Sequence, residues 1–335
     1  MRSGPVLRRA FATRQRALHK QLAVALEGDG HAVHQARVAT RRLREALPVL
    51  GAGLGRKRVR KLRRRMRTLT QLFGAVRERD VALKMLETRQ SDGVVDTPGA
   101  ERVRALVDQG RDAARHHLTH TLDAHKVSRW LHDIKVFEEE LRESAEAQTS
   151  KDGVAPWSIE LARRLLRRTE WLRRTVNDAG VLFVSDRLHT VRVALKRLRY
   201  AVELAGELSG RKLEATLDEL KTCQDTLGAL HDLDMLMDYV SGALESELDP
   251  HLRTSLDGLQ MKLEAERHEL HARYLAQQPS LLVLIDRIQD QVVPRFTMAK
   301  AQAKNSGNGS ASRRKAAQDL RRQEPVERSS AGLRR

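Results

Sequence analysis

The sequence predicts an all-α protein made of two similar helical halves. Apolar residues recur at intervals of three and four along almost the whole chain, as at Leu62, Met66, Leu69 and Phe73, which is the spacing of one helix face. No stretch alternates with the period of two that is typical of strands. A basic helical pattern also occurs twice, with His34 and His189 at matching positions. The repeat predicts that a second half copies the first.

Length and composition narrow the class of protein. The chain has 335 residues and a single cysteine, Cys223, so it has ample length for a core and no disulfide framework. No apolar run approaches the roughly 18–20 residues needed to span a bilayer, and the N-terminal segment lacks the apolar region of a secretory signal. We therefore expect a soluble, cytoplasmic protein without membrane contact.

The charge balance predicts a polyanionic partner. The formal net charge is +18, which favours binding to nucleic acid, an anionic membrane surface or another phosphate polymer. Composition alone does not choose among these partners.

Turn-forming segments divide the chain into helices. Residues 27–32 and 48–55 contain the glycines and the proline that end helices. A longer loop is expected at 89–100, the boundary between the halves at 144–156, and a further helix start at 247–250.

These breaks predict one domain over residues 5–297, with halves at 5–142 and 156–297. Residues 299–335 are polar, Gly/Ser-containing and Arg-rich, and such a segment buries too little apolar surface to offset chain entropy. We expect a disordered basic tail whose Arg clusters add non-specific affinity for anions.

A second match makes the repeat longer than one helix. The segments LFGAVRERDVALKML (72–86) and TLGALHDLDMLMDYV (226–240) follow the two basic helices at nearly the same distance. Gly74 aligns with Gly228, and Asp80 with Asp234. Because a solenoid needs about three or more repeats, two copies favour a closed pseudo-symmetric pair.

Each repeated helix carries a narrow stripe of positive charge. At 100° per residue, the stripe of the first copy covers roughly an 80° arc. Its residues are His34, Arg37, Arg41 and Arg44, and those of the second copy are His189, Arg192, Lys196 and Arg199. Like charges at these spacings repel each other, and a polyanion along the stripe would reverse that effect because arginine forks bind phosphate oxygens. Arg42 lies beside the main stripe, and Arg197 occupies the matching position.

The next helix extends the basic surface in the first half. Its cations repeat the same spacing, and they are Lys57, Arg60, Arg64 and Arg67. Lys221 occupies the Arg67 position in the second half, where Glu214 and Asp218 interrupt the stripe. We therefore expect the first half to be the more positive one.

The histidines admit several roles. His34 and His189 are interpreted as donors to phosphate, since bound negative charge favours their protonated form. A structural, metal-binding or catalytic role is the alternative. His116 and His120 have a spacing that can hold a metal, but without an obvious third ligand we expect a surface histidine cluster.

The matched acids Asp80 and Asp234 also leave two readings open. Paired acids near phosphate can hold Mg²⁺ for phosphoryl transfer. We favour the simpler role, in which they orient basic side chains through ion pairs.

The pattern H-x-x-R-x-x-x-[RK]-R-x-R, followed by an LG-x-x-[RH]-D-x-D-like segment and then repeated, resembles the CHAD domain family. The resemblance covers about residues 5–297. It implies two bundles of long antiparallel helices related by a pseudo-two-fold axis around a basic central groove or pore. It also implies binding of inorganic polyphosphate and localisation to polyphosphate granules. The matching residues are His34, Arg37, Arg41, Arg42 and Arg44, with His189, Arg192, Lys196, Arg197 and Arg199.

Two departures from family relatives are visible. Glu78 stands where the family often has an aspartate, which conserves the charge. The E-x-E-x-K strand of the triphosphate-tunnel domain that precedes many relatives is not found, so triphosphate hydrolysis is not implied.

Three functions therefore compete. Non-enzymatic binding of polyphosphate is favoured, because recognising a flexible chain without bases needs only dense, convergent cations. A nucleic-acid binder is the first alternative, although single-strand binders use aromatic platforms and Tyr200 is the only aromatic in either basic helix. A metal-dependent polyphosphate-processing enzyme is the second. The favoured function involves no catalytic residue, cofactor or metal.

Overall fold

The computed structural model describes residues 3–92, 97–147 and 155–296, and these residues form helices without any strand. The all-α prediction is confirmed. The first half contains α1 (Ser3–Leu26), α2 (Gly30–Leu50), α3 (Arg56–Ser91), α4 (Thr97–Thr121) and α5 (Ala124–Ala147). The second half contains α6 (Pro156–Ala179), α7 (Ser185–Ser209), α8 (Glu214–Ser246) and α9 (Pro250–Arg287), followed by a π-helical turn (Ile288–Val292) and a 3₁₀ turn (Val293–Phe296).

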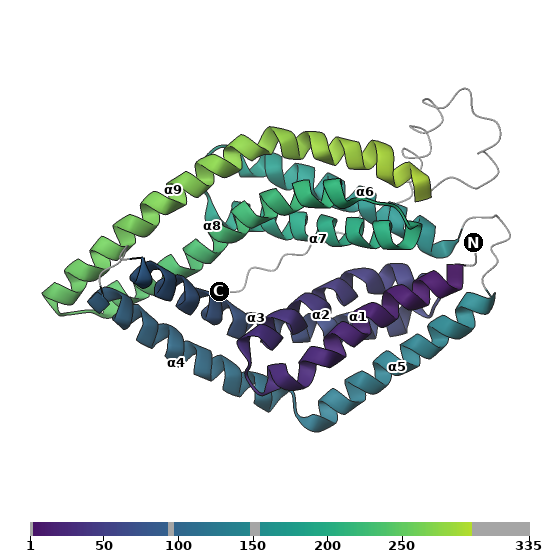
Figure 1. Cartoon of the computed structure of the whole chain (residues 1–335), viewed down its shortest axis with the longest axis horizontal. Coiled ribbons are helices and arrows are strands. Elements are labelled where there is room, and N and C mark those ends of the chain that lie inside the picture. Colours follow the sequence, from purple (N-terminus) through teal and green to yellow (C-terminus); the bar gives the residue numbers. More distant parts are fainter. Residues whose placement is uncertain (1–2, 93–96, 148–154, 297–335) are drawn as a thin grey trace.

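The two halves lie side by side in an elongated molecule (Figure 1). Helix α9 forms one long edge, and α4 and α5 form the opposite edge. Between the edges, α2 packs on α6 and α7, α1 packs on α7, and α3 packs on α8. Helix α4 reaches across to α8 and α9. The repeated basic helices of the sequence, α2 and α7, thus meet at the centre, while the pseudo-two-fold relation between the halves stays a prediction.

The apolar faces of α2 and α7 hold the basic faces in place. Ala36 and Leu43 of α2, and Val191 and Leu198 of α7, have no exposed surface. Each buried Leu or Val side chain contributes roughly 1.5–3 kcal/mol through its removal from water. Burial of one face fixes the rotation of each helix, so the charged stripe must point the other way.

Most predicted breaks coincide with helix ends. The turn at 27–29 contains Gly28 at φ 98°, and the side chain of Asp29 accepts a hydrogen bond of 2.6 Å from the backbone N–H of Ala32 at the start of α2. Such a cap satisfies one of the free donors of a helix N-terminus.

The predicted loop at 89–100 is wrong in extent, because α3 continues to Ser91 and α4 begins at Thr97. Arg89 donates a 2.6 Å hydrogen bond to Glu266 of α9, which holds the last turn of α3. The backbone N–H of Gly99 donates to the hydroxyl of Ser255 at 2.8 Å, and a Cβ at Gly99 would lie 2.6 Å from that oxygen. Contacts with α9 therefore fix the last turn of α3 and the first turn of α4.

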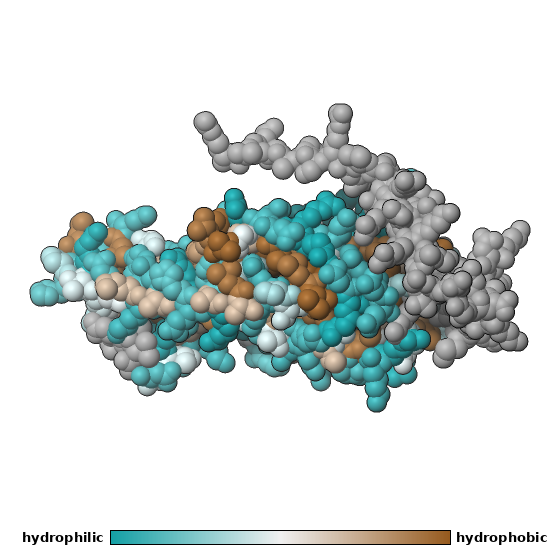
Figure 2. Space-filling view, turned by 90° about the horizontal axis from the view of Figure 1, so that it is seen from above, coloured by the Kyte–Doolittle hydropathy of each residue, from teal (hydrophilic) through white to brown (hydrophobic). Residues whose placement is uncertain are grey.

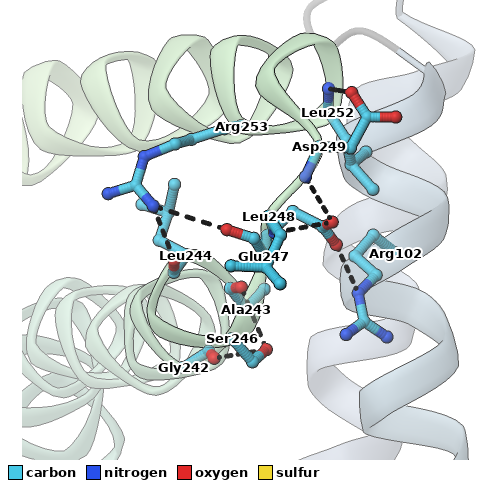
Figure 3. A network of polar contacts seen from close by, with 10 residues as sticks. All are labelled: Arg102, Gly242, Ala243, Leu244, Ser246, Glu247, Leu248, Asp249, Leu252 and Arg253. Carbon is cyan, nitrogen blue, oxygen red and sulfur yellow. Dashed lines mark hydrogen bonds and ion pairs between the residues drawn. The ribbon is translucent and has the colours of Figure 1, made fainter.

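The predicted helix start at 247–250 is confirmed, and Figure 3 shows how it is fixed. The side chain of Asp249 accepts hydrogen bonds from the backbone N–H groups of His251 and Leu252 at the start of α9, and Figure 3 draws the one from Leu252. Glu247 accepts from two backbone N–H groups of the turn and also from Arg102 of α4 at 3.2 Å. The turn from α8 to α9 is thus tied to the first half.

The outer surface is largely hydrophilic on the face drawn in Figure 2, where hydrophobic side chains form separate patches between broad hydrophilic areas. Within the described part of the chain, no helix is both long and apolar enough to cross a membrane. The predicted tail at 299–335 lies outside the described residues, as does most of the predicted linker between the halves.

We predict that Asp249→Ala lowers the free energy of unfolding by about 1 kcal/mol, because α9 loses its N-terminal cap. Asp257→Ala, at an exposed position further along α9, should change it by less than about 0.5 kcal/mol. Urea unfolding followed by circular dichroism measures both values. Equal stability of the two variants would contradict the assigned cap.

Candidate functional site

A central groove of about 480 Å³ opens between the two halves and is lined by α2, α3, α7 and α8. The predicted site residues that line it are His34, Arg37, Arg41, Arg192, Lys196 and Arg199. Residues from the basic stripes of α2 and α7 therefore line the same groove.

Positive charge exceeds negative charge in the central groove. Six basic side chains line it, namely those of the five predicted Arg and Lys residues and Arg77 of α3, against the three carboxylates of Glu78, Asp225 and Asp232. Among the described residues, neither Arg41 nor Lys196 lies within ion-pair distance of a carboxylate. The groove is therefore an electropositive surface with donors left free for an anion.

Each half supplies one arginine and one acid in matching positions. Nη2 of Arg37 lies 3.2 Å from Oε1 of Glu78, and Nη2 of Arg192 lies 3.6 Å from Oδ1 of Asp232. In both arginines the Nε atom is buried without an acceptor among the described residues. The acids orient each guanidinium but satisfy only part of its donors.

Burial and mutual repulsion lower the pKa values of cations in the groove, because both effects disfavour the charged form. Burial, followed by the charge of Arg41, lowers the pKa of Arg37 to about 10. Burial, followed by the charges of Arg192 and Arg41, lowers the pKa of Lys196 to about 6. Lys196 is therefore mostly neutral at neutral pH while the groove holds no anion.

The histidines share this environment. Nδ1 of His189 lies 3.2 Å from Nδ1 of His231, and burial, followed by the charge of Arg192, lowers the pKa of His231 to about 3. The pKa of His34 is lowered by burial and then by Arg77 and Arg37. The pKa of His189 is also lowered, first by burial and then by Arg192. The lowered pKa values favour the neutral form of all three rings, and bound negative charge would shift them back towards the protonated form.

The repeated glycines give room to the groove. A Cβ at Gly74 of α3 would lie 3.2 Å from Nε of Arg37, so the absence of a side chain lets that guanidinium cross the helix. Gly228 of α8 lines the groove itself, and a Cβ there would meet nothing within 4 Å. A larger residue at 228 would instead occupy space in the groove.

Several predicted site residues do not line the central groove, and one of them is His189, whose ring instead contacts His231 of the lining. The stripe of α3 (Lys57, Arg60, Arg64 and Arg67) is exposed and does not line it. Lys221 is exposed beside Asp225, with Nζ and Oδ2 3.8 Å apart, and Arg42 pairs with Glu203 at 3.1 Å. Arg44 and Arg197 lie near the junction of α2 with α6, where Glu45 acts on the pKa of both.

The matched acids, Asp80 of α3 and Asp234 of α8, lie beside the first residues of α2 and α7 and form no ion pair within the described chain. Oδ2 of Asp80 would be 3.4 Å from a Cβ at Gly30, and Asp234 accepts a 2.7 Å hydrogen bond from Ser185. Negative charge at a helix N-terminus is favourable, so these positions serve α2 and α7 in place of the expected ion pairs. His116 and His120 stack on α4 with ring centroids 6.3 Å apart.

Sequence reasoning missed the acids that contact the basic stripes. Glu78 and Asp232 are two residues before Asp80 and Asp234 in the repeated segment, and a shift of two positions turns a side chain by 200° on a helix. Arg77 and His231 also hold matching positions there. Projecting this segment on a helical wheel would have indicated all four residues.

Comparison with known proteins agrees with this architecture. The family model described as "CHAD domain" matches residues 9–241; the match ends within α8, while the helical fold continues to Phe296. The chain is also 29% identical over 211 residues to "Uncharacterized protein MT2285" and "Uncharacterized protein Rv2226" of two Mycobacterium tuberculosis strains. The matched region is 62% of this chain but 40% of each relative's length.

Two solved structures share the fold. A CHAD domain from the plant Ricinus communis superposes with a TM-score of 0.60 at 20% identity, covering 84% of this chain and 91% of that one. PptA from Streptomyces chartreusis has a TM-score of 0.51 at 15% identity, with 86% and 99% covered. Since the family model spans well over half of the sequence, the chain belongs to the CHAD domain family.

Proposed function

We propose that the protein binds inorganic polyphosphate in the central groove without turning it over. The observation that carries this proposal is that six basic side chains line one partly buried groove together with only three carboxylates. Charge-assisted hydrogen bonds from arginine to phosphate oxygens are strong, and they would satisfy the Nε donors that Arg37 and Arg192 leave free.

The lining of the groove favours a chain of phosphates over a nucleic acid. Single-strand binders stack bases on exposed aromatic rings. Tyr200 is the only aromatic ring besides histidine in the groove lining; it is 7% exposed, and the guanidinium of Arg199 lies 5.2 Å from its centroid. The groove therefore offers cations but no free stacking platform.

A processing enzyme is less well supported. The acids that could hold Mg²⁺, Asp80 and Asp234, do not line the groove, and Asp232 is engaged with Arg192. Binding would instead recruit the protein to polyphosphate granules in the cytoplasm, in contact with other granule-associated proteins. Fluorescence microscopy of the tagged chain tests that role.

We predict that Arg41→Ala/Lys196→Ala weakens binding of long-chain polyphosphate roughly 100-fold, because each lost charge-assisted contact contributes about 1.5 kcal/mol or more. Neither residue has an ion-pair partner in the described chain, so the fold should persist. The control Lys57→Ala/Arg64→Ala on the exposed face of α3 removes the same two residue types and should change the affinity less than about 5-fold.

Fluorescence anisotropy with labelled polyphosphate across a salt series measures both variants, with single-stranded DNA as competitor. The slope of log affinity against log salt should be shallower for the groove variant, because fewer counterions are released. Equal losses in the two variants, or equal displacement by DNA, would refute a polyphosphate site in the groove.

We also predict net proton uptake on binding at pH 7.5. Free Lys196 has a pKa of about 6, and phosphate beside it raises that pKa, so binding adds a proton. Affinity should increase as the pH falls from 8 to 6 and level off below, where free Lys196 is already charged.

Calorimetry in two buffers with different ionisation enthalpies gives the number of protons. Lys196→Met should lower the uptake by about one proton at most, whereas Lys212→Met, at an exposed position, should leave it unchanged. Binding without proton uptake by the wild-type protein would argue against Lys196 as a contact.

A further inference from the structure

A second group of arginines lies at the junction of α2 and α6, and none of its members lines the central groove. The group, called here the arginine cluster, surrounds a single carboxylate. It consists of Arg44 of α2, Arg164 and Arg168 of α6 and Arg197 of α7 around Glu45 of α2, together with Arg63 of α3, which acts on Arg44, Arg164 and Arg197. Five cations from four helices thus share one anion.

Glu45 neutralises only a small part of this charge. It is 4% exposed, with Oε2 2.9 Å from Nη2 of Arg168 and 3.7 Å from Nη1 of Arg164. In the described chain, none of the five arginines forms an ion pair with a carboxylate other than Glu45. Glu160 pairs with Arg163 and acts on Arg164 only from a greater distance. The five arginines therefore exceed their one paired carboxylate by four charges.

The cluster also contains unused hydrogen-bond donors. The Nε atoms of Arg63, Arg164, Arg168 and Arg197 are buried and find no acceptor among the described residues. Arg164 is 9% exposed, so its free donor is almost withdrawn from water. Leaving such a group unpaired costs roughly 1–3 kcal/mol, which an arriving oxyanion would remove.

The junction of α1 with α7 shows that this packing does not require surplus charge. There too, the first helix of one half contacts the repeated helix of the other. Arg14 pairs with Glu207 at 2.6 Å, and Arg42 and Arg199 pair with Glu203 at 3.1 and 3.0 Å. Three arginines face two glutamates, so the excess at the other junction is a property of that site.

Trp171 of α6 holds part of the cluster in position. The guanidinium carbon of Arg197 lies 4.9 Å from the centroid of its ring, and that of Arg168 lies 5.9 Å away. Stacking on an aromatic face orients a planar guanidinium without using its N–H groups. The donors stay available to a ligand, and the indole becomes a local reporter of binding.

We propose that the arginine cluster is a second phosphoryl-binding site, separate from the central groove. Arg44 connects the two, because it follows Arg41 by three residues, about 4.5 Å along the axis of α2, and Arg41 acts on its charge. The inference rests on the proposed function for its ligand class, phosphate oxyanions. The source is either the same polyphosphate chain continuing past Arg41 or a separate small phosphate.

The test follows the indole N–H signal of Trp171 by NMR, assigned with Trp171→Phe, during titration with long-chain polyphosphate and with pyrophosphate. Sodium chloride at equal ionic strength is the reference. The titrations are repeated in Arg63→Gln/Arg197→Gln and in its charge-matched control Arg58→Gln/Arg174→Gln. They are also repeated in the groove variant Arg41→Ala/Lys196→Ala.

We expect a saturable shift of the Trp171 signal that needs at least 10-fold more phosphate in the cluster variant and is unchanged in the control. A response to pyrophosphate that persists in the groove variant identifies a separate phosphate. A response to long chains alone, lost in the groove variant, identifies a continuing chain. No shift beyond that caused by sodium chloride, or an equal shift in the cluster variant, overturns the second site.

Thermal unfolding without phosphate supplies an independent criterion. The cluster variant should melt at the same temperature as the wild type or higher, because two repelling cations are removed. A fall of several degrees would show that these arginines serve the fold, which also overturns the site. Polyphosphate affinity of the groove, measured separately by anisotropy, shows whether a failure concerns the cluster alone or the proposed function.

Discussion

The packing of two helices holds their positive charges close together against mutual repulsion, and the rest of the structure depends on this constraint. The apolar faces of α2 and α7 are buried, and this burial compels their basic faces to share the central groove with α3 and α8. Hydrophobic packing at the back of each helix supplies the free energy that opposes the repulsion at the front. The lowered pKa of Lys196 and the free donors of Arg37 and Arg192 are consequences of that arrangement.

Duplication explains how the groove acquires charge on both sides. Each half contributes an arginine on its repeated helix and an acid on the next helix, as Arg37 with Glu78 and Arg192 with Asp232. One helix alone would expose its stripe to water, where the charges are screened. Two helices facing a partly buried space create a stronger field, which a flexible polyanion can follow. The halves differ elsewhere, because the α2–α6 junction keeps a large surplus of positive charge, whereas each arginine at the α1–α7 junction is paired with a glutamate.

Helical periodicity was sufficient to predict the all-α class, most helix ends and the two basic stripes, because these features depend on local spacing. The sequence also indicated six residues that line the groove, since each lies opposite an apolar face on its own helix. It could not show that the stripe of Lys57 and Arg60 faces outward, because that orientation depends on how α3 packs against α2 and α5. Arg44 and Arg197 were predicted as site residues, but their grouping with Arg63 and Arg164 was not. Arg63 and Arg164 are 101 residues apart in the sequence, and only tertiary packing brings them together.

The most direct measurement is a crystal structure of the protein grown with long-chain polyphosphate. We expect phosphorus density in the central groove, within hydrogen-bonding distance of Arg37 and Arg41 on one side and of Arg192 and Lys196 on the other. Such density would show that convergence of the two helices creates the site. Density confined to the exposed face of α3, beside Lys57 and Arg64, with an empty groove would contradict this explanation of the fold.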